Sequence, residues 1–220
     1  MSMTRHVDFE VPNWGELTAP PGTWPLIGQG GGEPLRDAIL ALSPVGYWRL
    51  DEPAGATSFL DGSGQNRTLT RTGTVTSGSP PLTEGDAACL VQRLGHLERT
   101  DAALAETGSV TVIAWIRWDG PMSAEAYHGV CSQWRFAEGA RNWALAVENN
   151  TAHPVGVITF FARPTEAAGA AARSDTPLTP GQIAMVAGVW DAVASEARLY
   201  LDGTLIATDP HTGGPLETTD

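Results

Sequence analysis

A tight turn near the end of the chain constrains its fold most. The pair Asp202-Gly203 separates two runs in which apolar and polar residues alternate. This arrangement is typical of a two-residue type I′ β-hairpin, because both central residues must adopt positive φ and Asp and Gly tolerate it. The register that follows places Leu201 opposite Thr204 and Leu199 opposite Ile206. One face of the hairpin is then apolar, formed by Ala197, Leu199, Leu201 and Ile206.

Most of the chain before this hairpin also has the pattern of short strands separated by turns. The segment Val110–Trp118 is apolar on both faces, which predicts a central strand that is covered on both sides. Further strands are predicted at residues 46–51, 87–91, 94–97, 130–134, 142–148, 155–162 and 183–190, with a small-residue loop at 167–172. A short helix is predicted at residues 34–42, where apolar residues recur at helical spacing after a proline. The pattern therefore indicates an all-β fold with one short helix.

The composition agrees with such a fold. The chain has 220 residues, enough for one large β-sandwich or two small domains with a substantial core. It contains 25 glycines and 16 prolines, as many short strands joined by tight turns require. Cys89 and Cys131 lie in apolar stretches, so they are either buried free thiols or one disulfide, and two cysteines alone cannot form a zinc site.

The charge argues against two classes of partner. The net charge is −12, which disfavours nucleic acid and anionic membrane surfaces because both need clustered cations. All 13 cationic residues are arginine, which is typical of a GC-rich genome. The first residues contain no apolar segment, so we expect no signal peptide, and no apolar stretch approaches the roughly 18 residues of a membrane span.

Residues 1–33 differ from the rest of the chain. They are rich in proline and glycine and cannot build a core of their own, yet they contain large apolar residues: Trp14, Trp24, Leu26 and Ile27. We interpret this segment as an extended arm that attaches the protein to its neighbours, for instance by adding a strand to a sheet edge. The alternative is an arm that folds back over its own sandwich, with Trp14 and Trp24 covering an edge.

Several segments together resemble a known family. They occur in the family's order and lie at residues 43–52 (SPVGYWRLDE), 55–57, 61–64, 110–116 (VTVIAWI), 185–191 (MVAGVWD) and 199–203 (LYLDG). This set resembles the laminin-G-like, or concanavalin A-like, domains found in bacterial and bacteriophage proteins, including minor tail proteins. The resemblance implies a jelly-roll sandwich of two antiparallel sheets over residues 43–220. The family usually continues past the hairpin, so we predict that this sandwich lacks closing strands of its own.

The sequence offers no set of catalytic residues. Glycosidases on this fold need two carboxylates facing each other across a site, and no strand carries them on one face. Asp51 and Glu52 are adjacent, so their side chains would point to opposite faces, and the five histidines are scattered. We therefore predict that the protein is not an enzyme.

Two kinds of binding site are candidates. The resemblance implies a calcium ion on a sheet-edge loop, and Asp51, Asp61 and Asn66 could supply its oxygen ligands, although Asp61 could instead only form the turn. Flat aromatic side chains can stack on sugar rings, and the candidates are Tyr127, Trp134 and Trp118. The alternative for these aromatics is packing in the core.

Three functions agree with these observations. The first is a non-catalytic bacteriophage virion protein, a minor tail or decoration protein, that is assembled in the host cytoplasm and contacts other virion proteins, copies of itself and host-surface glycans. The second is a carbohydrate-binding or adhesion module of a larger secreted bacterial protein. The third is a polysaccharide hydrolase or lyase, which the missing carboxylate pair disfavours.

Overall fold

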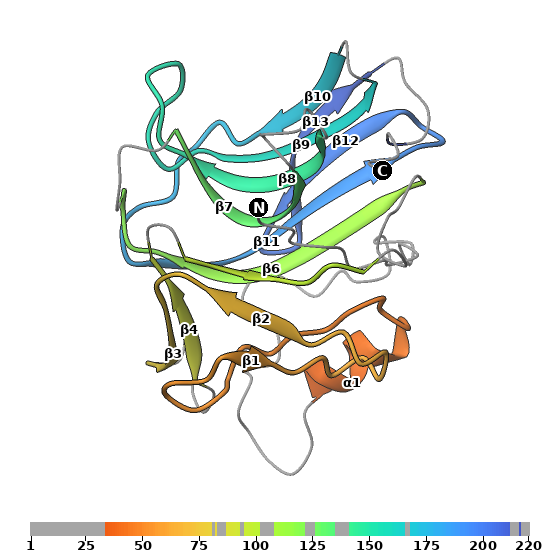
Figure 1. The fold of residues 1–220 in the computed structure, drawn as a ribbon. Coiled ribbons are helices and arrows are strands. Elements are labelled where there is room, and N and C mark those ends of the chain that lie inside the picture. The colour runs from red at the N-terminus through yellow and green to blue at the C-terminus, as the bar shows by residue number, and fades with distance from the viewer. Residues whose placement is uncertain are drawn as a thin grey trace.

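The computed structural model describes residues 34–80, 82, 87–92, 95–101, 108–121, 126–134, 141–165, 168–211 and 216. These residues form one helix and thirteen strands (Figure 1). The elements are α1 (Pro34–Ala41), β1 (Ser58–Phe59), β2 (Leu69–Thr72), β3 (Val75–Ser79), β4 (Ala88–Val91), β5 (His96–Glu98), β6 (Val110–Trp118), β7 (Tyr127–Trp134), β8 (Arg141–Glu148), β9 (Ile158–Thr165), β10 (Ala168–Arg173), β11 (Gln182–Asp191), β12 (Glu196–Leu201) and β13 (Thr204–Pro210).

Two four-stranded antiparallel sheets form the body of the protein. One has the strand order β10-β9-β8-β7 and the other has the order β13-β12-β11-β6. Figure 1 shows the two sheets stacked face to face, with the strands of the first sheet bowing toward the second. This arrangement confirms the all-β sandwich of two antiparallel sheets that the strand pattern predicts, and α1 confirms the short helix.

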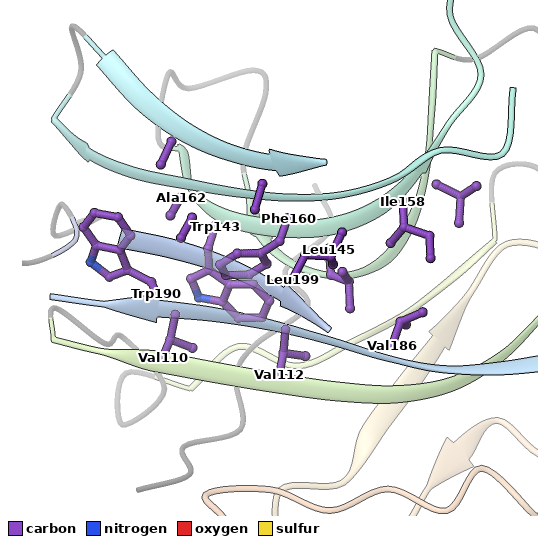
Figure 2. Close-up of a cluster of buried hydrophobic side chains, with 14 of the residues drawn as sticks. Val110, Val112, Trp143, Leu145, Ile158, Phe160, Ala162, Val186, Trp190 and Leu199 are labelled. Atoms are coloured by element: carbon purple, nitrogen blue, oxygen red, sulfur yellow. The ribbon is translucent and has the colours of Figure 1, made fainter. Parts of the chain in front are cut away.

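The core lies between these sheets. Alternation along each strand sends every second side chain into the space between the layers (Figure 2). The largest buried side chains there include Trp143, Leu145, Ile158 and Phe160 from one sheet and Val110, Val112, Val186, Trp190 and Leu199 from the other. The layers meet tightly where the ring of Phe160 lies against Gly188, since a Cβ atom built on Gly188 would be 2.1 Å from that ring.

The strands before β6 form a separate apolar cluster. Strands β1, β2 and β5 form a three-stranded sheet, and β3 pairs with β4. Their buried residues are Phe59, Leu69, Val75 and Leu97, with Trp48 and Leu50 packed against them. Figure 1 shows this region on the side of β6 and β11 that faces away from β7–β10. On that outward face Ala187, Val189 and Tyr200 are also buried, so this sheet is covered on both sides.

Two strand predictions need correction. Strand β6 is covered on both faces as expected, but it is the outermost strand of its sheet among the described strands, not a central one. Residues 46–51 are not a strand: they contribute one isolated bridge, between Trp48 and Asp61. The cause is local backbone geometry, since Leu50 has a φ of 61° and the carbonyl of Tyr47 accepts a hydrogen bond from Gly62 in a loop.

The predicted loop at 167–172 is also wrong, because residues 168–173 form strand β10. Alanine has low strand propensity, but here its small side chain lets the edge strand pack tightly on the core. Ala170 and Ala172 are buried there, and Ala172 pairs with Phe160 across the sheet. Tertiary packing decides the structure of this segment.

The hairpin prediction is correct for the turn and its first residue pair but wrong for the pairing of Leu199. Asp202 and Gly203 have φ values of 49° and 78°, as a type I′ turn requires, and Leu201 pairs with Thr204. A β-bulge then shifts the register, so that Leu199 pairs with Ala207 and not with Ile206. An extra residue in one strand leaves the preceding pairs unchanged and displaces all later ones.

The two sheets are linked at one side of the sandwich. The N–H of Ala171, on the outer strand β10, donates to the Asp209 carboxylate of β13 at 2.6 Å. A carboxylate there occupies a backbone donor that an open edge would otherwise present to another chain. The absence of closing strands stays a prediction. The assembly arm, with Trp14, Trp24, Leu26 and Ile27, lies outside the described residues.

The cysteines are free thiols, both partly buried. Burial raises the pKa of Cys131 to about 12, and burial together with the charge of Glu52 raises that of Cys89 to about 11. Thiols with such pKa values stay protonated near neutral pH and are poor nucleophiles. Among the described helices none is long and apolar enough to cross a membrane.

The contact between Phe160 and Gly188 gives a first testable prediction. Gly188→Ala places a methyl group inside the Phe160 ring and should lower the free energy of unfolding by about 1–3 kcal/mol. Gly129→Ala is the matched control, because Gly129 also lies in a strand and a Cβ atom built on it would meet nothing beyond its chain neighbours within 4 Å. Urea denaturation measures both variants. Equal stabilities would contradict this account of the core, whereas partial recovery in Gly188→Ala/Phe160→Leu would support it.

Candidate functional site

The structure separates the three aromatic residues predicted as sugar platforms. Trp118 points into the core, is only 7% exposed and packs its ring against His128 with centroids 5.2 Å apart. Its predicted role as a platform is therefore wrong, because a core side chain cannot stack on a ligand. The side chain of Trp134 lies outside the described residues. Tyr127 is 41% exposed and remains a candidate.

Tyr127 belongs to a cluster of three side chains on the outer face of the β7–β10 sheet. Its ring meets the edge of Phe161 with centroids 5.4 Å apart and an interplanar angle of 86°. The guanidinium carbon of Arg173 lies 5.4 Å from the centroid of the same Phe161 ring. Cation–π and edge-to-face contacts of this kind hold planar groups in defined orientations. The three residues come from β7, β9 and β10.

Strand alternation explains why these residues lie on the outer face. In β9, Ile158, Phe160 and Ala162 face the core, so Thr159, Phe161 and Arg163 face outward. In β8 the core-facing positions place Glu148 outward in the same way. Cross-strand neighbours of the cluster are small: Gly129 pairs with Ala146, and Ala144 and Ala171 both pair with Phe161. The aromatic rings therefore stand above a floor of small residues on a sheet that bows inward (Figure 1).

A buried carboxylate lies next to the aromatic cluster. Glu148 is fully buried although it lies on the outward face of β8. Its Oε1 accepts hydrogen bonds from the Thr159 hydroxyl and, at 2.9 Å, from Nε of Arg173. Its Oε2 accepts one from the Asn150 amide at 2.6 Å. A buried charge is tolerated only when it is paired and hydrogen-bonded, and these three donors meet that requirement.

Asn150 connects this network to the loop that follows β8. While its amide nitrogen donates to Glu148, its Oδ1 accepts hydrogen bonds from the backbone N–H groups of Ala152 and His153. Such a side chain forms an Asx-type turn that orders the loop. Glu148 therefore holds both the guanidinium of Arg173 and the loop beside the cluster.

The hydrogen bonds also determine the ionisation of Glu148. Burial by itself would raise the pKa of this carboxyl group, but the hydrogen bonds from Thr159, Asn150 and Arg173 and the charge of Arg173 outweigh it, so the pKa lies below its ordinary value. The carboxylate is thus ionised near neutral pH. A group in this state cannot serve as a general acid there, and glycosidic cleavage needs both an acid and a second carboxylate. Glu148 is the only acidic residue within β7, β8, β9 and β10.

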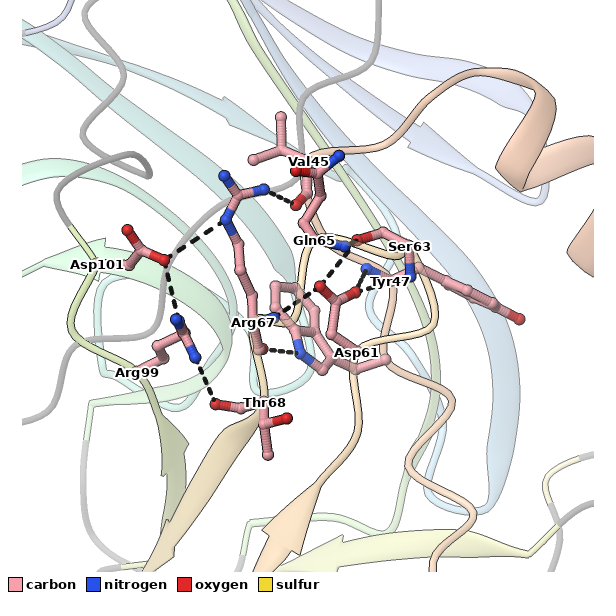
Figure 3. A network of polar contacts seen from close by, with 10 residues as sticks. Val45, Tyr47, Asp61, Ser63, Gln65, Arg67, Thr68, Arg99 and Asp101 are labelled. Carbon is pink, nitrogen blue, oxygen red and sulfur yellow. Dashed lines mark hydrogen bonds and ion pairs between the residues drawn. The ribbon is translucent and has the colours of Figure 1, made fainter.

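The predicted calcium ligands have other partners. Figure 3 shows Asp61 at the centre of a loop, where Oδ1 accepts from the N–H groups of Tyr47 and Ser63. Its Oδ2 accepts from the Ser63 hydroxyl and the N–H of Arg67. Partial burial acts to raise the pKa of Asp61, but these hydrogen bonds lower it overall. The carboxylate thus organises the turn, the alternative role predicted for this residue.

The other two predicted ligands do not complete a cation site. Asp51 forms an ion pair with Arg49 at 2.9 Å, and Asn66 supplies a left-handed turn residue with a φ of 58°. Binding Ca²⁺ at Asp61 would displace N–H and O–H donors that a cation cannot replace. In the described ranges, no three His, Cys, Asp or Glu side chains are grouped closely enough to hold a metal ion. The residues as arranged therefore do not fit a calcium ion.

Two arginines join this loop to the chain that leads into β6. Nε of Arg67 lies 3.6 Å from the Asp101 carboxylate, and its guanidinium also donates to the carbonyl of Val45. Arg99 pairs with the same carboxylate at 3.1 Å and donates to the carbonyl of Thr68 (Figure 3). Each guanidinium bridges segments distant in sequence, so this cluster serves the structure of the N-terminal strands.

Of this cluster and its carboxylate partner, only Tyr127 was among the residues predicted from the sequence, whereas Glu148, Phe161 and Arg173 were not. Part of the signal was present. In Ile158–Thr165 two phenylalanines are adjacent, so one of them must face outward. Arg173 ends a run of alanines and glycine that was interpreted as a loop, and the strand β10 that carries it was therefore overlooked. The meeting of Arg173 with Glu148 has no sequence signal, because they are 25 residues apart.

The buried carboxylate gives the second prediction. Glu148→Gln replaces an acceptor by an amide that cannot satisfy all three donors, and it should destabilise the protein by about 1–3 kcal/mol at pH 7. Because the folded-state pKa is below the ordinary value of 4.5, this stabilisation is present above pH 4.5 and disappears as the pH falls through the folded-state pKa. Urea denaturation of both proteins between pH 7 and pH 3 should show the difference shrinking.

The matched control is Glu196→Gln. Glu196 also pairs with an arginine, Arg198, but both side chains are about one-quarter exposed. Solvated ion pairs contribute about 0–1 kcal/mol, so this change should have the smaller effect. A cost for Glu148→Gln no larger than that of the control, or one independent of pH, would contradict the described network.

Comparison with known families agrees with this architecture. A model of the Laminin_G_3 family, described as Concanavalin A-like lectin/glucanases superfamily, matches residues 94–220. A comparison with curated proteins finds no match. The matched range covers strands β5 to β13 and therefore both sheets of the sandwich, while the resembling segments at residues 43–64 precede it. The chain thus belongs to the Concanavalin A-like lectin/glucanases superfamily.

Proposed function

We propose that this protein is a non-catalytic glycan-binding and attachment module, with the outer face of the β7–β10 sheet as its binding surface. The exposed ring of Tyr127 beside Phe161 carries the proposal. Aromatic side chains present large apolar surfaces with little conformational freedom, which suits the apolar faces of sugar rings. Arg173, fixed next to these rings by Glu148, adds hydrogen-bond donors for sugar oxygens.

The proposal that the module is non-catalytic rests on the number and accessibility of the carboxyl groups on this face. Retaining and inverting glycosidases place two carboxyl groups about 5–10 Å apart around the scissile bond. Within strands β7 to β10 Glu148 stands alone, fully buried and held as an ion pair. A group that is inaccessible and committed to Arg173 lacks the mobility and protonation state that sugar cleavage requires.

Binding measurements test the site. Tyr127→Ala should weaken binding of glycans identified on a glycan array about tenfold, because it removes the exposed ring but no core contact. Leu205→Ala is the control, since Leu205 is similarly exposed at 48% but lies on β13 of the other sheet. Calorimetry gives the affinities, and a reducing-end assay on the bound glycans should detect no cleavage. Equal losses in both variants, or measured cleavage, would contradict the proposal.

The setting that we propose is a bacteriophage virion, where the module is part of a minor tail or decoration protein and contacts host-surface glycans. The support is compositional: the chain is acidic and has arginine as its only cationic residue besides histidine, as in proteins of GC-rich genomes. Partners would be other virion proteins and copies of this chain, reached through residues 1–33. In a repetitive particle many weak sites act together, so a modest single-site affinity suffices.

Mass spectrometry of purified virions tests this setting. Peptides of this chain should co-purify with intact particles through a density gradient, in a constant ratio to the major structural proteins. The comparison sample is the medium and cell-surface fraction of uninfected bacteria. Peptides found only in that second sample would contradict the virion setting and support the alternative, a carbohydrate-binding module of a larger secreted protein.

A further inference from the structure

The outer face of the β7–β10 sheet has a charge that differs from that of the whole protein. The chain carries 25 acidic residues against 13 arginines, a net charge of −12. On this face the alternation of β9 and β10 places Arg163 and Arg173, whereas Glu148 is the only acidic residue within the four strands. The sheet is therefore locally cationic in an otherwise acidic protein. A surface that binds uncharged sugars would not need a charge opposite in sign to that of the whole protein.

Arg173 is held in a way that leaves part of its guanidinium available. Its Nε donates to Glu148 at 2.9 Å, and its plane lies near the Phe161 ring. In the part of the chain that the structure describes, this Nε contact is the hydrogen bond that the guanidinium makes, and the side chain is 34% exposed. The opposite edge of the group carries two Nη atoms in a rigid fork. Such a fork matches the two oxygens of a carboxylate or sulfate.

We infer that this face is selective for anionic glycans, in which a carboxylate or sulfate group on the sugar binds the free edge of Arg173 while a ring packs on Tyr127 and Phe161. The inference rests on the proposed glycan-binding function and specifies its substrate class. Carboxylated and sulfated sugars share the feature that the arginine recognises, namely two anionic oxygens on one group that can accept a pair of parallel hydrogen bonds. Arg163, on the same face, adds attraction without contributing to the fork.

The ion pair with Glu148 does not cancel this selectivity. Glu148 is fully buried, and its charge is shared among donors on Thr159, Asn150 and Arg173. A ligand on the surface therefore meets the exposed guanidinium edge and not the carboxylate. The acidic residues elsewhere are screened over a Debye length of about 8 Å at physiological salt, so the local cations dominate at contact distance. By fixing the guanidinium, Glu148 also reduces the entropy that a ligand must remove.

The experiment measures the affinity of the full chain for three oligosaccharide probes. They are a hyaluronan hexasaccharide with carboxylates, a heparin hexasaccharide with sulfates and carboxylates, and the uncharged maltohexaose. At least one anionic probe should bind about ten times or more as tightly as maltohexaose, and this ratio should fall as the salt concentration rises. The two anionic probes distinguish recognition of carboxylate from recognition of sulfate. Arg173→Gln should reduce the ratio to near one, and Arg173→Lys should retain only part of it, because lysine keeps the charge but not the fork.

Arg198→Gln is the matched control. Arg198 is also a partly exposed arginine that pairs with acidic residues, but it lies on β12 of the other sheet. Its loss should therefore leave the ratio of affinities unchanged. If Arg173→Gln fails to fold, as judged by near-ultraviolet circular dichroism, the ratio and salt dependence of the wild-type protein decide the question. Equal binding of charged and uncharged probes overturns the inference.

The design separates this inference from the proposed function. Binding of maltohexaose that is as tight as that of the anionic probes and is weakened by Tyr127→Ala would leave the proposed glycan site intact and refute its anionic selectivity. An unchanged ratio in a folded Arg173→Gln protein would do the same. Absence of binding to all three probes and to a glycan array would overturn both the proposed function and the inference.

Discussion

The Phe160 ring of one sheet packs directly against the backbone of Gly188 in the other, and this contact leaves no room for a side chain at position 188. Any side chain at position 188 would overlap the ring, so glycine is needed there for Phe160 to take its place in the core beside Trp143 and Trp190. Once these rings face inward, the two-residue period of each strand assigns every other position. Thr159, Phe161 and Glu148 lie on the outer face because their neighbours in sequence fill the core. The candidate site is in this sense a consequence of core packing.

Glu148 shows how a polar group can be buried on the outward face of a sheet. Three donors from three different segments, Thr159, Asn150 and Arg173, satisfy its two oxygens. The same contacts orient the guanidinium against Phe161 and order the loop after β8. One buried carboxylate therefore fixes both this loop and the arginine of the proposed binding surface. The N-terminal strands use a comparable device, in which Asp61 holds a turn through four donors and Arg67 and Arg99 bind a shared carboxylate.

The superfamily to which the chain belongs includes both lectins and glucanases, so membership alone does not decide between binding and catalysis. Our proposal of binding rests on the arrangement of charges on the outer sheet. Catalysis requires two accessible carboxyl groups with different protonation states, whereas recognition requires fixed donors and apolar surface. An exposed tyrosine, a phenylalanine and a partly exposed arginine on one rigid sheet correspond to the second requirement.

The sequence by itself determined the strand-rich class, the short helix, most strands of the sandwich and the type I′ turn at Asp202-Gly203, because alternation and turn chemistry are local properties. It did not determine three features: residues 46–51 are interrupted by Leu50 in a left-handed conformation, strand β10 depends on its packing against the core, and an extra residue in the hairpin displaces Ile206. For the site, exposure of Tyr127 was predicted, whereas the core position of Trp118 and the pairing of Glu148 with Arg173 were decided only by the tertiary structure. The stacking of the sheets decides which face of a strand meets the core and which distant charge lies beside it. The sequence of a single strand does not indicate which other strands will pack against it.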